Sequence, residues 1–226
     1  TGDISALIVP HAGLVYSGRV AAHAYRQIEQ RHIDTVVLVG PSHHVAFEGV
    51  SIYRRGGFDS PLGVAPVDDA CATRLLEADP HVVREHPSAH VREHSLEMQL
   101  PFIRRLLPHA SIVPLVMGRQ TRETATALGR ALATAVSGTR ALLVASSDLS
   151  HFEAAERAHA LDMQVVEAVE QFDPEQLQDL LDANDRHACG GGPIVSVMRA
   201  ARALGARDAV VLNYGDSGDV SGDKSS

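Results

Sequence analysis

The chain has 226 residues, of which 45% are hydrophobic, and its formal net charge is −8. This length supports one sizeable core, so we expect a single domain over residues 1–226. The acidic balance, without any run of Lys or Arg, argues against a nucleic-acid partner. No stretch of eighteen apolar residues occurs, so the sequence also argues against a membrane span.

The cysteine and histidine contents differ in what they indicate. Two cysteines far apart, Cys71 and Cys189, do not suggest a disulfide framework, so we expect a cytoplasmic protein. No charged segment followed by a short apolar one opens the chain, and no signal peptide is therefore predicted. Thirteen histidines against 4% aromatic residues is the unusual feature. It raises the question of where the histidines cluster.

Six short apolar runs predict β-strands. Most of them are β-branched and apolar throughout, which is typical of strands that are covered on both faces. The predicted strands are residues 4–9, 35–40, 50–53, 111–116, 141–145 and 209–213.

Helical spacing of apolar residues occurs between these runs. The proline at position 101 predicts a kink or break in one of the helices, and Asp173 followed by Pro174 predicts a capped helix start. Strands that alternate with helices predict an α/β three-layer sandwich, with a central mixed, largely parallel sheet flanked by helices. The predicted helices are residues 18–30, 66–78, 95–107, 121–136, 154–172, a helix from 174, and 193–204.

Histidines follow three of the predicted strands directly. His11 follows the first strand, His43 and His44 follow the second, and Asp148 and His151 follow the fifth. Ligands of open α/β sheets bind outside the carboxyl ends of the strands. A single histidine in such a place is usually a hydrogen-bonded loop residue, but three strand ends with the same feature favour a shared site.

Two further segments carry reactive side chains. His94 stands at a predicted helix start, and the neighbouring Glu93 and Glu97 are expected to form a solvated acidic face. Cys189 precedes three glycines and a helix, where the helix dipole favours its thiolate and the glycines permit close backbone approach. Cys71, in contrast, is expected to pack in the core.

Imidazole and thiolate groups together suit zinc, copper or iron. Two histidines with one anionic ligand and open positions are typical of non-haem iron(II). The sequence has no CxxC pair and no G-x-S-x-G motif, so neither a structural zinc finger nor a serine hydrolase is supported.

The same motifs resemble the Memo family, which in bacteria and archaea is called AmmeMemoRadiSam system protein B. The likeness runs from about residue 7 to the polar tail. The stretch that usually precedes the first strand is missing, and so is a closing strand after the tail, so we expect a chain truncated at both ends. The matching motifs are Val9-Pro10-His11-Ala12-Gly13, Tyr16-Ser17-Gly18, Ala22-His23-Ala24-Tyr25, Gly40-Pro41-Ser42-His43-His44, Glu93-His94-Ser95-Leu96-Glu97-Met98, Ser146-Ser147-Asp148-Leu149-Ser150-His151 and Cys189-Gly190.

The family is similar in fold to the class III extradiol ring-cleaving dioxygenases, whose iron is held by two histidines and a carboxylate. The resemblance implies metal ligation by His11, His43 and Cys189, with Cys189 at the place of the carboxylate. Iron(II) is the expected metal, and copper or zinc are the alternatives. It further implies that the pocket is lined by three acid/base or outer groups, Asp148, His151 and His94, and that His44 has a structural or outer role.

These implications favour a metal-dependent oxidative or redox enzyme with an undefined small-molecule substrate. The family name implies a radical-SAM protein and an AMMECR1-type protein as pathway partners. Because a thiolate is itself oxidisable, ring cleavage does not follow from the likeness. The alternative is a non-catalytic module that binds a phosphopeptide or small acid, for which Arg54, Arg55 and Arg92 are the local basic candidates. A third possibility is that the metal is cargo.

Overall fold

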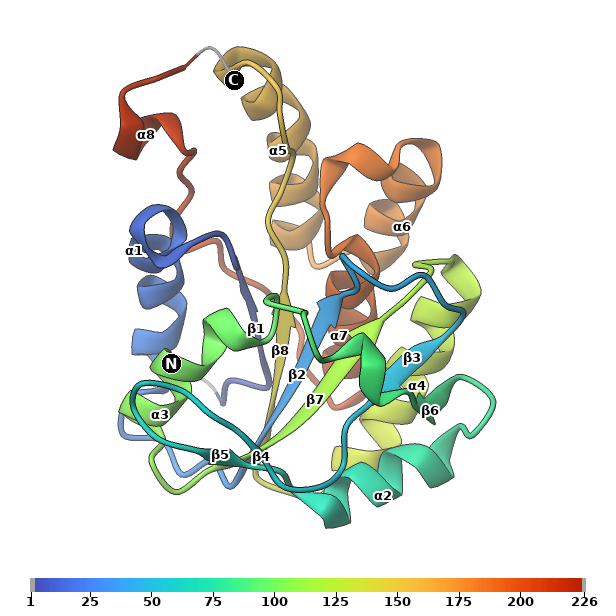
Figure 1. Cartoon of the computed structure of the whole chain (residues 1–226). Helices are drawn as coiled ribbons and strands as arrows, with labels where there is room; N and C mark the ends of the chain where they lie inside the picture. The colour runs from blue at the N-terminus through green and yellow to red at the C-terminus, as the bar shows by residue number, and fades with distance from the viewer. Residues whose placement is uncertain (1–2, 225–226) are drawn as a thin grey trace.

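The computed structural model describes residues 3–224 and contains a six-stranded sheet with helices on both faces (Figure 1). The sheet order is β1-β8-β2-β7-β3-β6. Strands β1, β8, β2 and β7 run parallel, β3 is antiparallel to β7, and β6 is parallel to β3. The predicted mixed, largely parallel sheet is therefore confirmed. The strands are β1 (Ala6–Val9), β2 (Thr35–Pro41), β3 (Val50–Ile52), β6 (Val83–Glu85), β7 (Ser111–Met117) and β8 (Ala141–Ser146).

Strand β2 explains why the strands are apolar throughout. All seven of its residues are buried. Val37 and Val39 belong to one hydrophobic cluster, while Val36 and Leu38 belong to the cluster on the opposite face. Successive side chains of a strand point to opposite faces, so a strand covered on both sides has no solvent-exposed positions and is mostly apolar.

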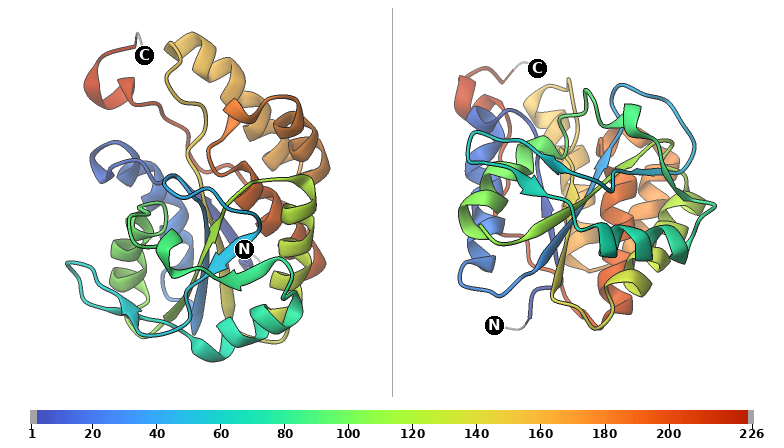
Figure 2. Two further views of the ribbon diagram at one scale, coloured as in Figure 1. Left: turned by 45° about the vertical axis from the view of Figure 1, so that its right-hand side comes forward. Right: turned by 60° about the horizontal axis from the view of Figure 1, so that its bottom comes forward.

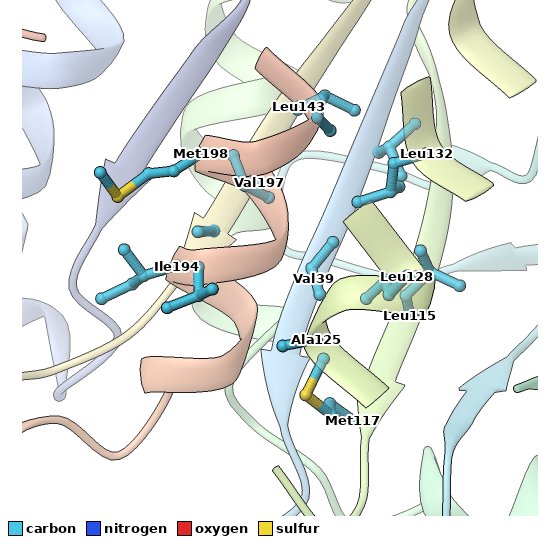
Figure 3. Close-up of a cluster of buried hydrophobic side chains, with 14 of the residues drawn as sticks. Val39, Leu115, Met117, Ala125, Leu128, Leu132, Leu143, Ile194, Val197 and Met198 are labelled. Carbon is cyan, nitrogen blue, oxygen red and sulfur yellow. The ribbon is translucent and has the colours of Figure 1, made fainter. Parts of the chain in front are cut away.

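Helices form the two outer layers, as the two views of Figure 2 show. α1 (Leu14–Tyr25) and α3 (Leu100–Leu106) cover one face, and α2 (Asp69–Ala78), α4 (Arg122–Val136) and α7 (Gly191–Ala203) cover the other. α5 (Ala155–Glu170) and α6 (Pro174–Ala183) extend the second layer, and a short α8 (Gly218–Ser221) lies near the C-terminus. Figure 3 shows side chains of α4 and α7, among them Leu128 and Val197, packed over strand side chains such as Leu115 of β7.

Local capping explains where several helices begin. The carboxylate of Asp173 accepts hydrogen bonds from the backbone N–H groups of Glu175 and Gln176, which confirms the predicted cap of α6. The predicted helix 95–107 is interrupted as Pro101 suggested: a 3₁₀ turn, Glu97–Gln99, precedes α3, and the proline occupies its first turn. Within residues 3–224, no helix is long and apolar enough to cross a membrane.

The predicted strand at residues 209–213 is wrong. This stretch has no regular structure, although its composition is that of a strand. It shares with β1 the lining of a cavity of about 1010 Å³, so space and not a hydrogen-bonded ladder separates the two. Three short strands were not predicted: β6 and the pair β4 (Gly57–Phe58) and β5 (Ala65–Pro66). At two or three residues they are too short to give a periodic signal.

Buried His90 makes the stability of the fold depend on pH. It hydrogen-bonds Ser51 through Nε2, and burial lowers its pKa to about 4. Unfolded histidine titrates near 6.5, so below that pH the unfolded state binds the proton first and stability falls until pH reaches about 4. We expect the free energy of unfolding to lose roughly 2–3 kcal/mol from this group between pH 7 and 4.5.

Urea unfolding of His90→Gln at both pH values measures this loss as a smaller pH dependence than in the unsubstituted chain. His109→Gln, at an exposed position, is the control and should keep the original dependence. An unchanged dependence in His90→Gln would contradict the assignment.

Candidate metal centre

The predicted histidines meet at the carboxyl end of the parallel strands, the upper end of the sheet in Figure 1. His11 follows β1, His43 follows β2, and Asp148 follows β8. β8 lies between β1 and β2, so the three loops are neighbours. The rings of His11 and His43 lie with their centroids 5.3 Å apart.

The hydrogen bonds around His11 determine which ring nitrogen carries the hydrogen. Its Nδ1 lies 3.0 Å from Ser146 Oγ. That hydroxyl donates its single hydrogen to the carbonyl of Ser95 and accepts from the amide of Gln99. His11 Nδ1 is therefore the donor in this contact, which leaves Nε2 for the contact with Cys189. Nε2 lies 3.2 Å from the sulfur of Cys189.

Glu93 orients His43 in the same way. Its carboxylate accepts from His43 Nδ1 at 2.8 Å and from the backbone N–H of His43 at 2.6 Å. Burial raises the pKa of Glu93, but hydrogen bonds from His43 and from the N–H of Ser95 outweigh it and lower the pKa to about 2. Because Nδ1 of His43 is hydrogen-bonded to Glu93, it is Nε2 that contacts Cys189. The sulfur of Cys189 and the carboxylate of Glu93 together raise the pKa of His43 to about 10.

Cys189 reaches the site just before the N-terminus of α7. Its Sγ accepts the backbone N–H of Asp148 at 3.3 Å, and its own N–H donates to the Asp148 carbonyl at 3.2 Å. Burial raises the pKa of the thiol, but hydrogen bonds from His11, His151 and His43 lower it to about 4. At neutral pH the sulfur is a thiolate, the form that binds a metal.

The remaining predicted side chains surround these three. The ring of His94 stacks on His43 at 4.9 Å between centroids, and His44 lies farther out, 6.3 Å from His94. Asp148 accepts backbone hydrogen bonds from His11 and Ala12. The ligand atoms of His11, His43 and His94 lie within 4.8 Å of one another, and so do those of His11, Asp148 and Cys189. Either set has the composition of a metal site.

Close backbone approach explains the first glycine after Cys189. A Cβ added to Gly190 would lie 2.6 Å from the carbonyl oxygen of Ser146 and 2.8 Å from Ser147 Cβ. The N–H of Gly190 donates to the hydroxyl of Ser147. Gln120 holds the other side of the turn, since its side chain donates to the Cys189 carbonyl and accepts from the N–H of Gly192. The turn is thereby fastened to the ends of β8 and β7.

Sequence reasoning missed the supporting residues of the site. Glu93 was expected on a solvated acidic face, and that expectation is wrong: its side chain is 1% exposed and faces His43. The four-residue spacing to Glu97 suggested a common helix face, but residue 93 precedes the 3₁₀ turn and is not helical. Ser146, Gln99 and Gln120 had no signal of their own, because their roles depend on contacts between distant segments.

A family comparison identifies the chain. The family model described as "Memo-like protein" matches residues 2–226 of the chain. The chain belongs to the Memo family. A MEMO1 family protein of Methanosarcina mazei is 40% identical over 225 residues, covering 98% of this chain and 82% of that relative. One of Ignicoccus hospitalis is 40% identical over 222 residues, covering 96% of this chain and 78% of the relative.

A solved structure has a similar fold. The crystal structure of the uncharacterized protein JW3007 from Escherichia coli K12 superposes with a TM-score of 0.62. The match covers 86% of this chain and 88% of that one, at 18% sequence identity. At this identity the likeness concerns the fold alone.

Gly190→Ala tests how the turn after Cys189 holds the thiolate. The added methyl group must displace the turn, so we expect Cys189 to lose hydrogen bonds and its pKa to rise from about 4 toward that of an ordinary thiol. The rate of iodoacetamide alkylation against pH measures this pKa, with Cys189→Ala as the blank. Gly18→Ala, where the new Cβ meets Leu14 at an ordinary 3.7 Å, should match the unsubstituted chain. An unchanged profile in Gly190→Ala would refute this account of the turn.

Proposed function

We propose that the chain is a metal-dependent redox enzyme whose metal is held by His11 Nε2, His43 Nε2 and Cys189 Sγ. The observation that carries the proposal is the fixed hydrogen placement on both imidazoles. Ser146 and Glu93 engage Nδ1 of the two rings, so Nε2 of each ring is directed at the one buried sulfur and is the atom left for a metal. Hydrogen-bonded outer partners of this kind are typical of histidines that ligate metals.

The donor set suits iron(II), with copper or zinc as alternatives. Two imidazoles and a thiolate are soft to borderline ligands, unlike the oxygen ligands that magnesium and calcium prefer. When bound, iron or copper supplies Lewis-acid and electron-transfer chemistry at this position. His94 and Asp148 lie close enough to complete the ligand shell or to remain free for proton transfer.

The pKa values of the two flanking histidines, His94 and His151, are shifted in opposite directions. Burial, and then the neighbouring charge of His43, lower the pKa of His94, so its ring is neutral at pH 7 and can accept a proton. The hydrogen bond to Cys189 raises the pKa of His151, which favours the protonated, donating form. A base and an acid beside one site suit proton transfer to and from an oxidisable small molecule.

The alternative of a module for a phosphopeptide or small acid lacks a specific observation in its favour. It requires basic residues at the pocket rim. Arg54 is instead engaged with Asp69 and Glu85. The redox enzyme is therefore the proposal that we carry forward.

Metal content after anaerobic purification tests the proposal. We expect near-stoichiometric iron or copper in the unsubstituted chain, and its loss in His43→Ala and in Cys189→Ala. The control is His44→Ala, which removes the adjacent imidazole and should retain the metal. Absence of bound or reconstitutable metal in the unsubstituted chain would refute the proposal and leave the binding module.

Metal binding should also release protons in a way that depends on Glu93. At pH 7 the Cys189 thiolate is already formed, whereas His43, with a pKa of about 10, must lose a proton to bind. We expect about one proton released per metal ion and an affinity that rises with pH up to about 10. Glu93→Gln should weaken binding roughly 10- to 100-fold and release fewer protons, because His43 then loses its partner charge.

Calorimetric titration with zinc in two buffers of different ionisation enthalpy measures both quantities. Glu97→Gln is the matched control, since Glu97 is exposed and four residues away. Equal affinity and proton release in Glu93→Gln and Glu97→Gln would contradict the role of Glu93.

A further inference from the structure

Asp162 joins two segments that meet beside the candidate metal centre, although it belongs to neither. It lies on α5 and its side chain is buried, with the residue 5% exposed. One carboxylate oxygen accepts the backbone N–H of Ser150 at 2.9 Å. The other accepts the hydroxyl of Tyr214 at 2.7 Å. A buried carboxylate is retained at low cost only when such partners satisfy it.

The Ser150 contact holds one end of the loop that carries Cys189's partners. Residues 147–151 follow β8, and the backbone of Asp148 forms hydrogen bonds with Cys189 in both directions. Ser150 is only two residues farther along. Its hydroxyl is buried and has no hydrogen-bond partner among residues 3–224, so the backbone N–H bond to Asp162 is the contact that anchors Ser150.

Tyr214 holds Asp162 from the other side. Burial, and then the nearby carboxylate of Asp162, raise the pKa of its hydroxyl, which therefore keeps its hydrogen and donates it. Its ring packs edge-on against His159, with centroids 5.6 Å apart. Farther along, the carbonyl of Lys224 accepts the N–H of Ala155, so the C-terminal segment returns to the start of α5.

We propose that Asp162 and Tyr214 are a positioning pair that fixes the loop 147–151 and thereby sets the position of the Cys189 sulfur. Neither side chain touches the candidate ligands, so both act through the backbone of Ser150 and Asp148. The expected effect on metal binding rests on the proposed function, whereas the expected effect on the loop 147–151 does not. Through Tyr214, the C-terminal segment becomes a determinant of thiolate ligation.

Cobalt(II) is the probe for the metal consequence, because its thiolate charge-transfer absorption reports sulfur ligation separately from histidine ligation. In Asp162→Asn the side-chain NH₂ replaces one acceptor oxygen, so it faces either the Ser150 N–H or the Tyr214 hydroxyl, which are both donors, and one hydrogen bond is lost. We expect affinity for cobalt to fall about tenfold with a weaker charge-transfer band. Tyr214→Phe should lower the cobalt affinity and the charge-transfer band in the same direction but by less. The double variant should match Asp162→Asn, because the two substitutions disrupt the same chain of contacts.

A metal-free measurement keeps the two proposals distinguishable. Amide hydrogen exchange at Asp148 and Cys189 should accelerate in Asp162→Asn and in Tyr214→Phe, whether or not cobalt binds. Lys224→Ala, which removes ion pairs to Asp216 and Asp219 in the tail, is the control and should alter neither measurement. Unchanged exchange at both amides would overturn the positioning role even if the melting temperature falls. Absence of cobalt binding in the unsubstituted chain would overturn only the proposed function.

Discussion

The arrangement of the site depends on two hydrogen bonds that hold Nδ1 of His11 and Nδ1 of His43. Ser146 and Glu93 accept these hydrogens; the Ser146 hydroxyl also donates to the Ser95 carbonyl and accepts from Gln99, and Glu93 also accepts from the N–H of Ser95. Neither ring can therefore rotate without leaving a buried polar atom unsatisfied, which costs free energy. The Nε2 atoms are thereby directed toward Cys189 before any ligand arrives. Such preorganisation is what a metal site or a proton-transfer site requires.

The sheet brings these residues together from distant parts of the chain. His11 and Cys189 are separated by 178 positions, yet their side chains lie 3.2 Å apart. Strand β8 lies beside β1, and the loop after β8 supplies Asp148 both to His11 and to Cys189. The glycine turn then brings Cys189 against the end of β8, where a side chain at position 190 would collide with backbone. Fold and site thus share one set of contacts, and a substitution at Gly190 affects both.

The histidines at the strand ends could be predicted as site residues from the sequence, because apolar runs locate buried strands and ligands bind at the carboxyl ends of those strands. Cys189 was readable from the glycines and the helix that follow it. Glu93 was not, because a four-residue spacing suggests a helix face whether or not the backbone there is helical. Ser146 and Gln99 act through partners between 47 and 135 positions away, and Asp162 joins Ser150 to Tyr214, which is 52 positions beyond it; local patterns do not encode such pairings. The prediction of a strand at residues 209–213 was wrong for a related reason. β-propensity describes the composition of a strand, but a strand also needs a neighbouring strand to pair with.

The central claim is that one metal ion sits between two Nε2 atoms and the sulfur of Cys189. X-ray absorption at the zinc edge of the zinc-loaded chain tests it most directly, since sulfur and nitrogen ligands differ in distance, at about 2.3 Å and 2.0–2.1 Å. The account predicts one sulfur together with at least two imidazole nitrogens, and loss of the sulfur shell in Cys189→Ser. A shell of nitrogen and oxygen alone in the unsubstituted chain would contradict it.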